Sequence, residues 1–431
     1  MDYAVLQRWM EEHLPIVELL LKCLSDSRDT ATLDRIGALT DSEWHTLLRQ
    51  AFQQSINSLL FRYLRNLDDG VAIPENVIQS LRMSYLRNAN RNMQFYSALA
   101  DVLNSIQAQN IPVIVMKGAH LAEHVYDNIG LRYMNDLDIL VHKSDMPAVE
   151  AALLDLGFQH HKNPAWYDKH HFHYIFTLPD TPVFLEVHWG TFFTHDKFKI
   201  ELELMWETAQ PARIAGVDTL VFSPEVLLIY LGLHNYYHEY YGALMRLYDL
   251  AAVFRLYQDR IDWSFFQQYA LEHKLRKPLY VSYFFTKQWL QNGPPQDVME
   301  ALRPPDWNDQ VVEWARLELL LGHTSPLLRS TNVAALWKSK HLTQKLAILL
   351  RSMFPSRSYL AKRYSVAEDS WRSYSLYLRH LHDIFRRHGN SLWSLIHHDQ
   401  QVMVELERTS QWMALKQWML EDDKRPGQQQ T

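Results

Sequence analysis

Cysteine and glycine are scarce in this chain of 431 residues. Its one cysteine, Cys23, excludes an internal disulfide, and such sparse use fits a reducing compartment. Glycine contributes 13 residues, whereas Leu, Trp and Tyr are frequent, and this balance favours helix over strand. The remaining composition is that of a globular protein, and the length is sufficient for two or three domains.

Long apolar runs are also missing. No stretch approaches the roughly 18 to 20 consecutive apolar residues that a membrane-spanning helix needs. The first residues include Glu11 and Glu12 and lack the apolar segment of a signal peptide. We therefore expect a soluble, cytoplasmic protein with no transmembrane segment.

Acidic residues are absent from residues 319–367, although the whole chain has a net charge of −6. This window holds eight basic residues, so its net charge is positive, whereas the net charge of the rest of the chain is negative. The eight are Arg329, Lys338, Lys340, Lys345, Arg351, Arg357, Lys362 and Arg363. A basic block of this kind, here residues 329–363, suggests an anionic partner such as nucleic acid, an anionic membrane or a phosphorylated substrate. A solvated face balanced by acidic neighbours in the fold is the alternative.

Short strand-like runs occur only in the middle of the chain. Helical periodicity dominates the first 100 residues, with a helix start at 41–44, and returns after a second start at 223–225. Between them, strands are predicted at 111–116, 137–141, 174–178 and 183–189, and helices at 119–126 and 146–156. We therefore predict an α+β fold that is mostly helical and contains a small α/β core.

Asp136 and Asp138 are the strongest chemical signal. Because they lie two residues apart in an apolar run, they face the same side of a strand. Buried carboxylates rarely share a face without a cation, because like charges in an apolar environment are costly. Glu186, on a second apolar strand, could complete a set of oxygen ligands suited to Mg²⁺. Such a site serves metal-assisted phosphoryl or nucleotidyl transfer.

Lys117 and Gly118 stand between a predicted strand and a predicted helix. Glycine allows backbone N–H groups to approach a phosphate, and a helix N-terminus favours anions. Lys117 could add a positive charge for a triphosphate. Arg132 could bind phosphate as well, or it could pair with an aspartate to hold the loop.

The histidines give weaker signals. His188 shares a face with Glu186 and could support the site or be an ordinary half-buried histidine. His234 and His238 are four residues apart on a predicted helix, but no glutamate of the zinc-protease pattern stands between them, so a substrate-facing or core helix is favoured. A further group matches no usual zinc spacing, so we predict a polar loop. Its members are His160, His161, His170, His171 and His173.

Together these motifs resemble the uncharacterised bacterial nucleotidyltransferase family, which is part of the DNA polymerase β-like nucleotidyltransferase superfamily. The residues that carry the resemblance are Lys117-Gly118, Arg132, Asp136-Leu137-Asp138 and Glu186-Val187-His188-Trp189. Weaker similarity extends over residues 88–118, 223–234 and 246–250, and into the C-terminal part at 354–364.

The resemblance implies Mg²⁺- or Mn²⁺-dependent transfer of a nucleoside monophosphate from an NTP such as ATP to an acceptor hydroxyl, with release of pyrophosphate. Asp136, Asp138 and Glu186 would hold the metal, and Glu186 would help to activate the acceptor. Lys117 and Gly118 would lie at the triphosphate. Arg246 and Asp249 match positions near the nucleotide, although an ion pair between helices explains them more simply. His188 and His234 would contact the residues that bind the metal and the nucleotide, and would hold them in position.

The implied organisation has five parts. These are an N-terminal helical region (1–100), a nucleotidyltransferase catalytic core (101–215), a helical segment completing the nucleotide pocket (216–292), a C-terminal helical region with the basic block (293–420), and a disordered tail (421–431).

The acceptor stays open, since a small molecule, a protein or RNA would suit the same chemistry. For an RNA or tRNA acceptor, residues 329–363 would bind phosphates, and affinity would fall steeply with salt. A catalytically inactive fold acting as a binding or scaffold protein is a second alternative. Residues 341–354 could then lie on an anionic membrane, or form a buried helix with a basic rim. A metal-dependent glycosyltransferase, which would bind a nucleotide-sugar, is a third.

Overall fold

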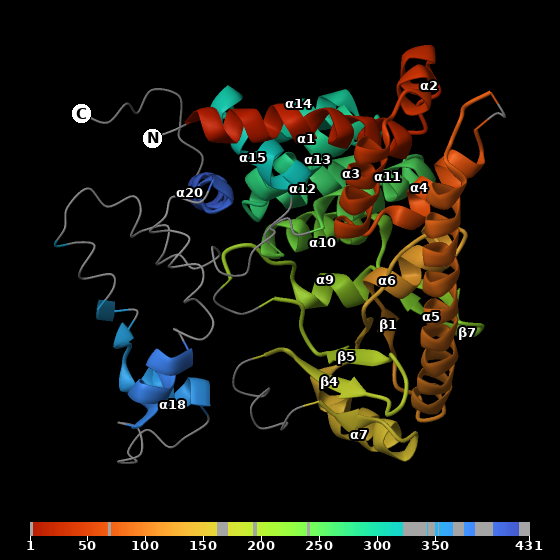
Figure 1. Cartoon of the computed structure of the whole chain (residues 1–431). Helices are drawn as coiled ribbons and strands as arrows, with labels where there is room; N and C mark the ends of the chain where they lie inside the picture. The colour runs from red at the N-terminus through yellow and green to blue at the C-terminus, as the bar shows by residue number, and fades with distance from the viewer. Residues whose placement is uncertain are drawn as a thin grey trace. The chain divides into compact units, whose positions relative to one another are not determined.

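The structure is a computed structural model that describes most of the chain in two compact units (Figure 1). One unit is Pro15–Trp307, and the other comprises the described residues up to Leu14 and those from Asn308 to Glu421. The described residues are 3–67, 70–161, 171–192, 196–238, 242–321, 343, 350–351, 353–364, 375–383 and 400–421.

Helices precede the first strand, as the sequence predicts. They are α1 (Tyr3–Leu24), α2 (Thr30–Gly37), α3 (Asp41–Gln53), α4 (Asn57–Arg65) and α5 (Glu75–Gln107). The predicted start of α3 is confirmed by a capping box, in which Thr40 and Glu43 bond each other's backbone N–H groups. Helix α5 has 33 residues and begins well before the expected 90–107 segment.

Among the described residues, seven strands form one mixed sheet in the order β3-β4-β5-β2-β1-β7-β6. The strands are β1 (Ile114–Val115), β2 (Leu137–Leu140), β3 (Gln159–His160), β4 (His173–Thr177), β5 (Phe184–His188), β6 (Gln210–Ile214) and β7 (Val217–Val221). Strand β2 is parallel to β5 and antiparallel to β1. The mostly helical α+β class is therefore confirmed.

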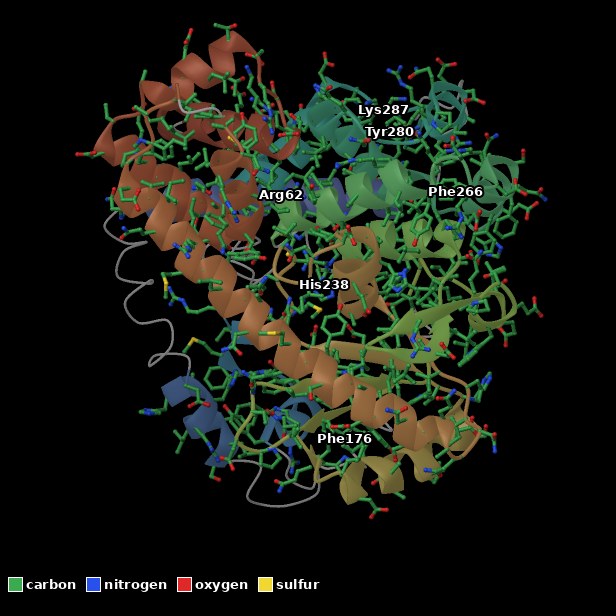
Figure 2. All side chains as sticks on the ribbon, turned by 90° about the vertical axis from the view of Figure 1, so that its right-hand side faces the viewer. Arg62, Phe176, His238, Phe266, Tyr280 and Lys287 are labelled. Atoms are coloured by element: carbon green, nitrogen blue, oxygen red, sulfur yellow. The ribbon has the colours of Figure 1, made fainter. Side chains whose placement is uncertain are left out.

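One face of the sheet is apolar and carries a hydrophobic core. Leu137 and Ile139 of β2 join the core, and Asp138 between them points to the opposite face. The long helix α5 runs beside the sheet, and α7 (Met146–Asp155) contributes Val149 and Leu153 to the same core (Figures 1 and 2). Phe176 of β4 is fully buried there. Hydrophobic burial on this face leaves the opposite face for polar side chains.

Helices resume after the sheet. The start of α10 at Pro224 is capped by Ser223, as the sequence predicted. These helices are α10 (Pro224–Tyr237), α11 (Ala243–Tyr257), α12 (Trp263–Glu272), α13 (Arg276–Leu290), α14 (Gln296–Leu302), α15 (Asp309–Leu321), α18 (Arg357–Tyr364) and α20 (Gln400–Leu420). None of the helices in the described ranges is long and apolar enough to cross a membrane.

Several local predictions were wrong. The hairpin of β6 and β7 was not predicted, although the Ala215-Gly216 turn has the positive φ angles of a tight hairpin (52° and 75°). The domain boundary expected at residue 215 falls in this turn. The helix predicted at 119–126 is a short helix α6 (Lys117–His120) followed by a π-helical turn at Leu121–Val125.

The predicted polar histidine loop is wrong for His160 and His173, because they lie in β3 and β4. Pairing with neighbouring strands, which sequence spacing does not report, places them there. His170 lies outside the described residues, as does most of the basic block and of residues 341–354.

We expect Phe176→Ala to lower the free energy of unfolding by about 3–5 kcal/mol, because it opens a cavity in the core beside the sheet. Phe184→Ala on the neighbouring strand is the matched control, since Phe184 is 40% exposed. Its effect should be within about 0.5–1 kcal/mol. Urea unfolding of both variants measures the difference, and equal losses would contradict this packing.

Candidate active site

The register of three strands gathers the candidate residues on the polar face of the sheet. Asp138 of β2 lies opposite Glu186 of β5, and His188 of β5 lies opposite His173 of β4. Asp136 directly precedes β2, two residues from Asp138, and thus points to the same side. The expectation that both aspartates and Glu186 share one face is therefore met by the backbone.

Lys117 follows β1 in a left-handed conformation with φ of 43°, which is unfavourable for a residue with a side chain. The Met116 N–H donates to the Asp138 carbonyl at 3.0 Å, so the turn is tied to β2. The Lys117 Nζ lies 2.7 Å from Asp138 Oδ1. This ion pair holds the strained turn against the carboxylate strand.

Asp138 is an enclosed carboxylate, with a side chain only 2% exposed. Burial would raise its pKa, but the Lys117 ammonium and a hydrogen bond from His188 Nε2 at 3.0 Å together lower it. Burial likewise disfavours charge on Lys117, yet Asp138 raises the pKa of Lys117 well above its usual range. Asp138 is therefore a charged acceptor already bonded to two cationic or potentially cationic groups.

Asp136 is in a different situation. No hydrogen bond or ion pair joins it to any residue in the part of the chain that the structure describes. Burial and the like charge of Asp138 raise its pKa to about 6. Since a nearby cation would favour the ionised form, this half-buried carboxylate suits a divalent cation as a ligand.

Glu186 is bonded to histidine. Its Oε2 lies 3.2 Å from His188 Nε2 and 4.0 Å from His173 Nε2. Burial would raise the pKa of Glu186, but the hydrogen bond with His188 lowers it overall. Its side chain is 22% exposed, so solvent and substrates can reach it.

Within the described ranges, three potential metal ligands lie close together. The ligand atoms of His173, Glu186 and His188 all lie within 4.8 Å of one another. The ligand atoms of Asp136, Asp138 and Glu186 do not lie as close to one another. In this structure the Lys117 ammonium contacts the Asp138 oxygen that a metal ion would otherwise bind. The donor chemistry fits a divalent metal, because carboxylate oxygens suit Mg²⁺ and Mn²⁺ while imidazole adds affinity for transition metals.

Arg132 and Asp249 form a buried bidentate pair. Arg132 Nε and Nη2 each lie 2.9 Å from an oxygen of Asp249, and the Tyr126 hydroxyl donates to the same carboxylate at 2.6 Å. Of the two roles considered for Arg132, this contact is the pairing with an aspartate, supplied by α11. Arg246, the other candidate on α11, lies one turn before Asp249.

The turn after β1 packs closely against Arg132 of this pair. A Cβ placed on Gly118 would lie 2.9 Å from Arg132 Nη1 and 3.0 Å from Met134 Sδ. Glycine is therefore required for close approach of the arginine. The loop carrying Arg132 is in turn held by Asn92 of α5, whose amide donates to the Arg132 carbonyl at 2.8 Å.

Helix α10 adds a residue that the sequence did not indicate. The Lys117 Nζ lies 5.9 Å from the centre of the Tyr230 ring, and the ring of His234 follows one turn later at 6.0 Å from that of Tyr230. The ring centres of His234 and His238 lie 4.0 Å apart (His238 is labelled in Figure 2), and burial lowers the pKa of both, that of His238 to about 3. The histidines are therefore neutral near pH 7.

Tyr230 and His173 are the additions to the predicted site. Tyr230 lies one helical turn before His234, so the helical period could have indicated it. His173 required knowledge of the β4–β5 pairing.

We expect Arg132→Met and Asp249→Asn each to lower the free energy of unfolding by about 3–5 kcal/mol, because each leaves a buried group without its charged partner. The control is Asp218→Asn, which breaks an exposed pair with Arg213 and should have a much smaller effect. Denaturant unfolding of the three variants measures this. An Asp249→Asn loss no larger than that of Asp218→Asn would contradict the role of the pair.

We expect Gly118→Ala to destabilise the protein by about 1–3 kcal/mol, because the new methyl group meets Arg132, which Asp249 holds in place. Gly37→Ala is the control, since nothing lies within 4 Å of a Cβ there and alanine is favoured in a helix. Thermal unfolding should show opposite or clearly unequal shifts; similar shifts would argue against close contact at Gly118.

Comparison with known proteins identifies the family. No curated protein matches the chain. Two solved structures show weak similarity. One is the solution structure of the antibiotic-resistance factor ANT(2″)-Ia, with 14% identity and a TM-score of 0.31 over 42% of this chain and 97% of that one. The other is a crystal structure of ANT(2″)-Ia with adenylyl-2″-tobramycin, with 13% identity and a TM-score of 0.27 over 48% and 93%.

TM-scores of this size do not establish a relationship by themselves. Residues 40–291, however, match the family described as uncharacterised nucleotidyltransferase, and this range is more than half of the chain. It contains the Lys117 turn, both aspartates, Glu186 and the Arg132–Asp249 pair. The chain therefore belongs to the uncharacterised nucleotidyltransferase family and is a nucleotidyltransferase enzyme.

Proposed function

We propose that this enzyme transfers a nucleoside monophosphate from an NTP to an acceptor hydroxyl and releases pyrophosphate, with Mg²⁺ or Mn²⁺ held by Asp136, Asp138 and Glu186. The observation that supports this most is the parallel pairing of β2 and β5. It sets Asp138 opposite Glu186 on the polar face of the sheet, beside the strained Lys117–Gly118 turn. His173 and His188 would be further ligands or neighbours of the metal.

The residues divide the chemistry among them. A divalent metal, when bound, would neutralise the phosphate oxygens and favour displacement at the α-phosphorus. Lys117, which bonds Asp138 here, would turn to the triphosphate when the carboxylate takes the metal. Tyr230 lies beside Lys117 and would guide this movement. The Arg132–Asp249 pair would keep the turn in place.

The transfer forms one bond and breaks one bond. The acceptor oxygen bonds to the α-phosphorus, while the bond from that phosphorus to the pyrophosphate oxygen breaks. The hydroxyl proton leaves to a carboxylate, and pyrophosphate carries away the electron pair. We assign this role to Glu186 rather than Asp138, because the Glu186 side chain is 22% exposed, whereas that of Asp138 is 2% exposed and paired with Lys117.

The segment 216–292 would complete the nucleotide pocket, since it supplies Tyr230, His234 and Asp249 around the turn. Arg246 and Asp249 would then have different roles. Arg246 would contact the nucleotide, and Asp249 would hold Arg132 in position. We leave the acceptor as a hydroxyl compound, and an RNA acceptor would bind through residues 329–363, most of which lie outside the described ranges.

The test is calorimetric titration of each NTP in Mg²⁺ with wild type, Asp136→Asn and Asp138→Asn. We expect one NTP to bind to wild type and its affinity to fall at least about tenfold in either variant, because each removes a charged ligand. Asp136→Asn is the cleaner variant, since Asp136 bonds no described residue, whereas Asp138→Asn also leaves Lys117 without its partner.

Asp218→Asn, which removes an exposed carboxylate far from β2 in the sequence, is the matched control and should bind as wild type does. Circular dichroism would confirm that all variants are folded. If no NTP binds, or if NTP binds equally to Asp136→Asn and wild type, the proposed site is wrong.

A further inference from the structure

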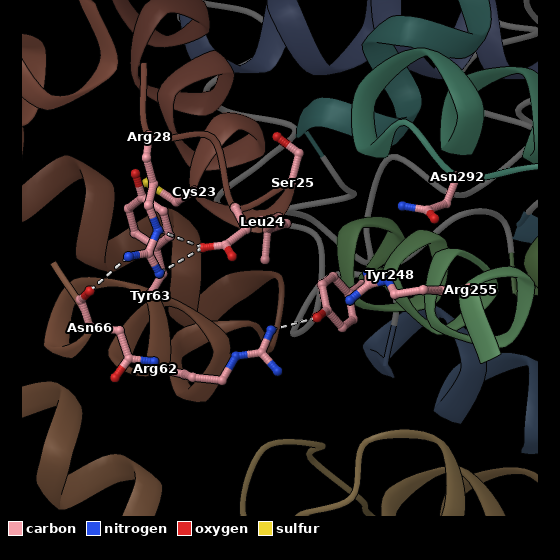
Figure 3. Close-up of a pocket in the computed structure, with 11 residues that line it drawn as sticks. Cys23, Leu24, Ser25, Arg28, Arg62, Tyr63, Asn66, Tyr248, Arg255 and Asn292 are labelled. Carbon is pink, nitrogen blue, oxygen red and sulfur yellow. Dashed lines mark hydrogen bonds and ion pairs between the residues drawn. The ribbon is translucent and has the colours of Figure 1, made fainter. Parts of the chain in front are cut away.

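A pocket lies among the helices, and the carboxylates of the sheet are not among its lining residues (Figure 3). The turn after α1, the end of α4, α11 and Asn292 after α13 line it, all within Pro15–Trp307. Its volume is about 410 Å³, a size that holds a small organic molecule. None of its lining residues belongs to the candidate active site.

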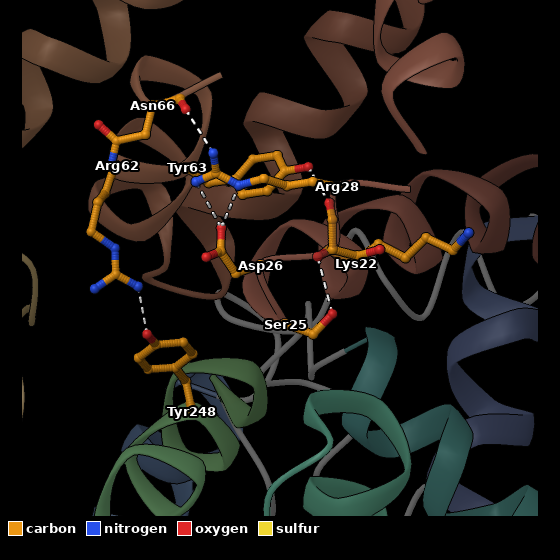
Figure 4. A network of polar contacts seen from close by, with 9 residues as sticks. Lys22, Ser25, Asp26, Arg28, Arg62, Tyr63, Asn66 and Tyr248 are labelled. Carbon is orange, nitrogen blue, oxygen red and sulfur yellow. Dashed lines mark hydrogen bonds and ion pairs between the residues drawn. The ribbon is translucent and has the colours of Figure 1, made fainter. Parts of the chain in front are cut away.

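The pocket has an excess of positive charge. Arg28, Arg62 and Arg255 line it, and Asp26 is the single acidic residue among the lining residues. Asp26 is bonded to Arg28 at 3.3 Å, and Arg28 also donates to the Asn66 carbonyl at 3.0 Å (Figure 4). Within the described ranges no carboxylate pairs with Arg62 or Arg255. Two guanidinium groups therefore remain for an anion.

Both arginines lie beside the ring of Tyr248, which lines the same pocket. The guanidinium carbons of Arg62 and Arg255 lie 5.8 and 6.0 Å from the centre of its ring. Arg62 also donates to the Tyr248 hydroxyl at 2.6 Å, which fixes the direction of its guanidinium (Figures 3 and 4). Contact with an aromatic ring limits the motion of an arginine without neutralising its charge.

We propose that this pocket binds a phosphate-bearing small molecule through Arg62 and Arg255. Guanidinium groups bind phosphate with paired, charge-assisted hydrogen bonds, and the doubly charged phosphate monoester matches two unpaired arginines better than a single carboxylate does. Asn292, whose side-chain amide donates to the Leu290 carbonyl at 2.7 Å, also lines the pocket. This proposal does not depend on the proposed nucleotidyl transfer.

The pocket is also connected to the turn at Lys117. Tyr248 is followed in the chain by Asp249, which holds Arg132, and the Tyr248 ring contacts that of Tyr126 at 5.4 Å. Tyr126 donates to the same Asp249 carboxylate. An occupant that shifts Tyr248 would therefore act on the pair that supports Gly118.

The test is calorimetric titration without metal, at constant ionic strength, using pyrophosphate and a nucleoside monophosphate as probes. We expect at least one probe to bind to wild type, and Arg62→Gln and Arg255→Gln each to weaken it about tenfold or more, since each loses charge-assisted bonds. Binding of both probes would show that phosphate is recognised; binding of the nucleotide alone would show that the base contributes.

Arg65→Gln on α4 is the matched control, because Arg65 is exposed and does not line the pocket, and it should bind as wild type does. Asp136→Asn should also retain the binding, which separates this pocket from the active site. Circular dichroism would confirm that the variants are folded. No binding by either probe, or binding unchanged in Arg62→Gln and Arg255→Gln, would overturn the proposal.

Discussion

The ion pair between Lys117 and Asp138 is the contact on which the candidate site depends. It joins the turn after β1 to the strand that carries the carboxylates, and it compensates a charge that burial would otherwise suppress. The same pair explains why Lys117 keeps a backbone conformation that disfavours side chains. Under the proposed function, the Lys117 ammonium that now contacts Asp138 would also meet the incoming triphosphate.

Around this contact, one face of β2 and β5 packs in the hydrophobic core, and the other face carries the candidate site residues. Every second residue of β2 and β5 enters the core shared with α5 and α7, and the residues between them carry the carboxylates and His188. The site therefore stands on strands whose position is fixed by burial of the opposite face. Arg132 and Asp249 extend this support to the helical segment, since they tie the loop before β2 to α11.

Much of this was predictable from local sequence. The Asp136 and Asp138 spacing, the apolar run around Glu186 and the Lys117–Gly118 turn all depend on nearby residues, and the α+β class followed from the change of period. What could not be predicted depends on distant pairing. Arg132 and Asp249 are 117 residues apart in the chain, and His173 reaches Glu186 through strand register alone. The β6–β7 hairpin was missed because its alternating pattern is short and partly polar.

The central claim is that the polar face of β2 and β5 holds a divalent metal together with an NTP. Electron paramagnetic resonance of Mn²⁺, titrated with the protein and a non-hydrolysable NTP, tests it directly. The account predicts a bound Mn²⁺ signal in wild type that is lost in Asp136→Asn, with the fold retained. Equal binding of Mn²⁺ and nucleotide by Asp136→Asn and wild type would contradict it.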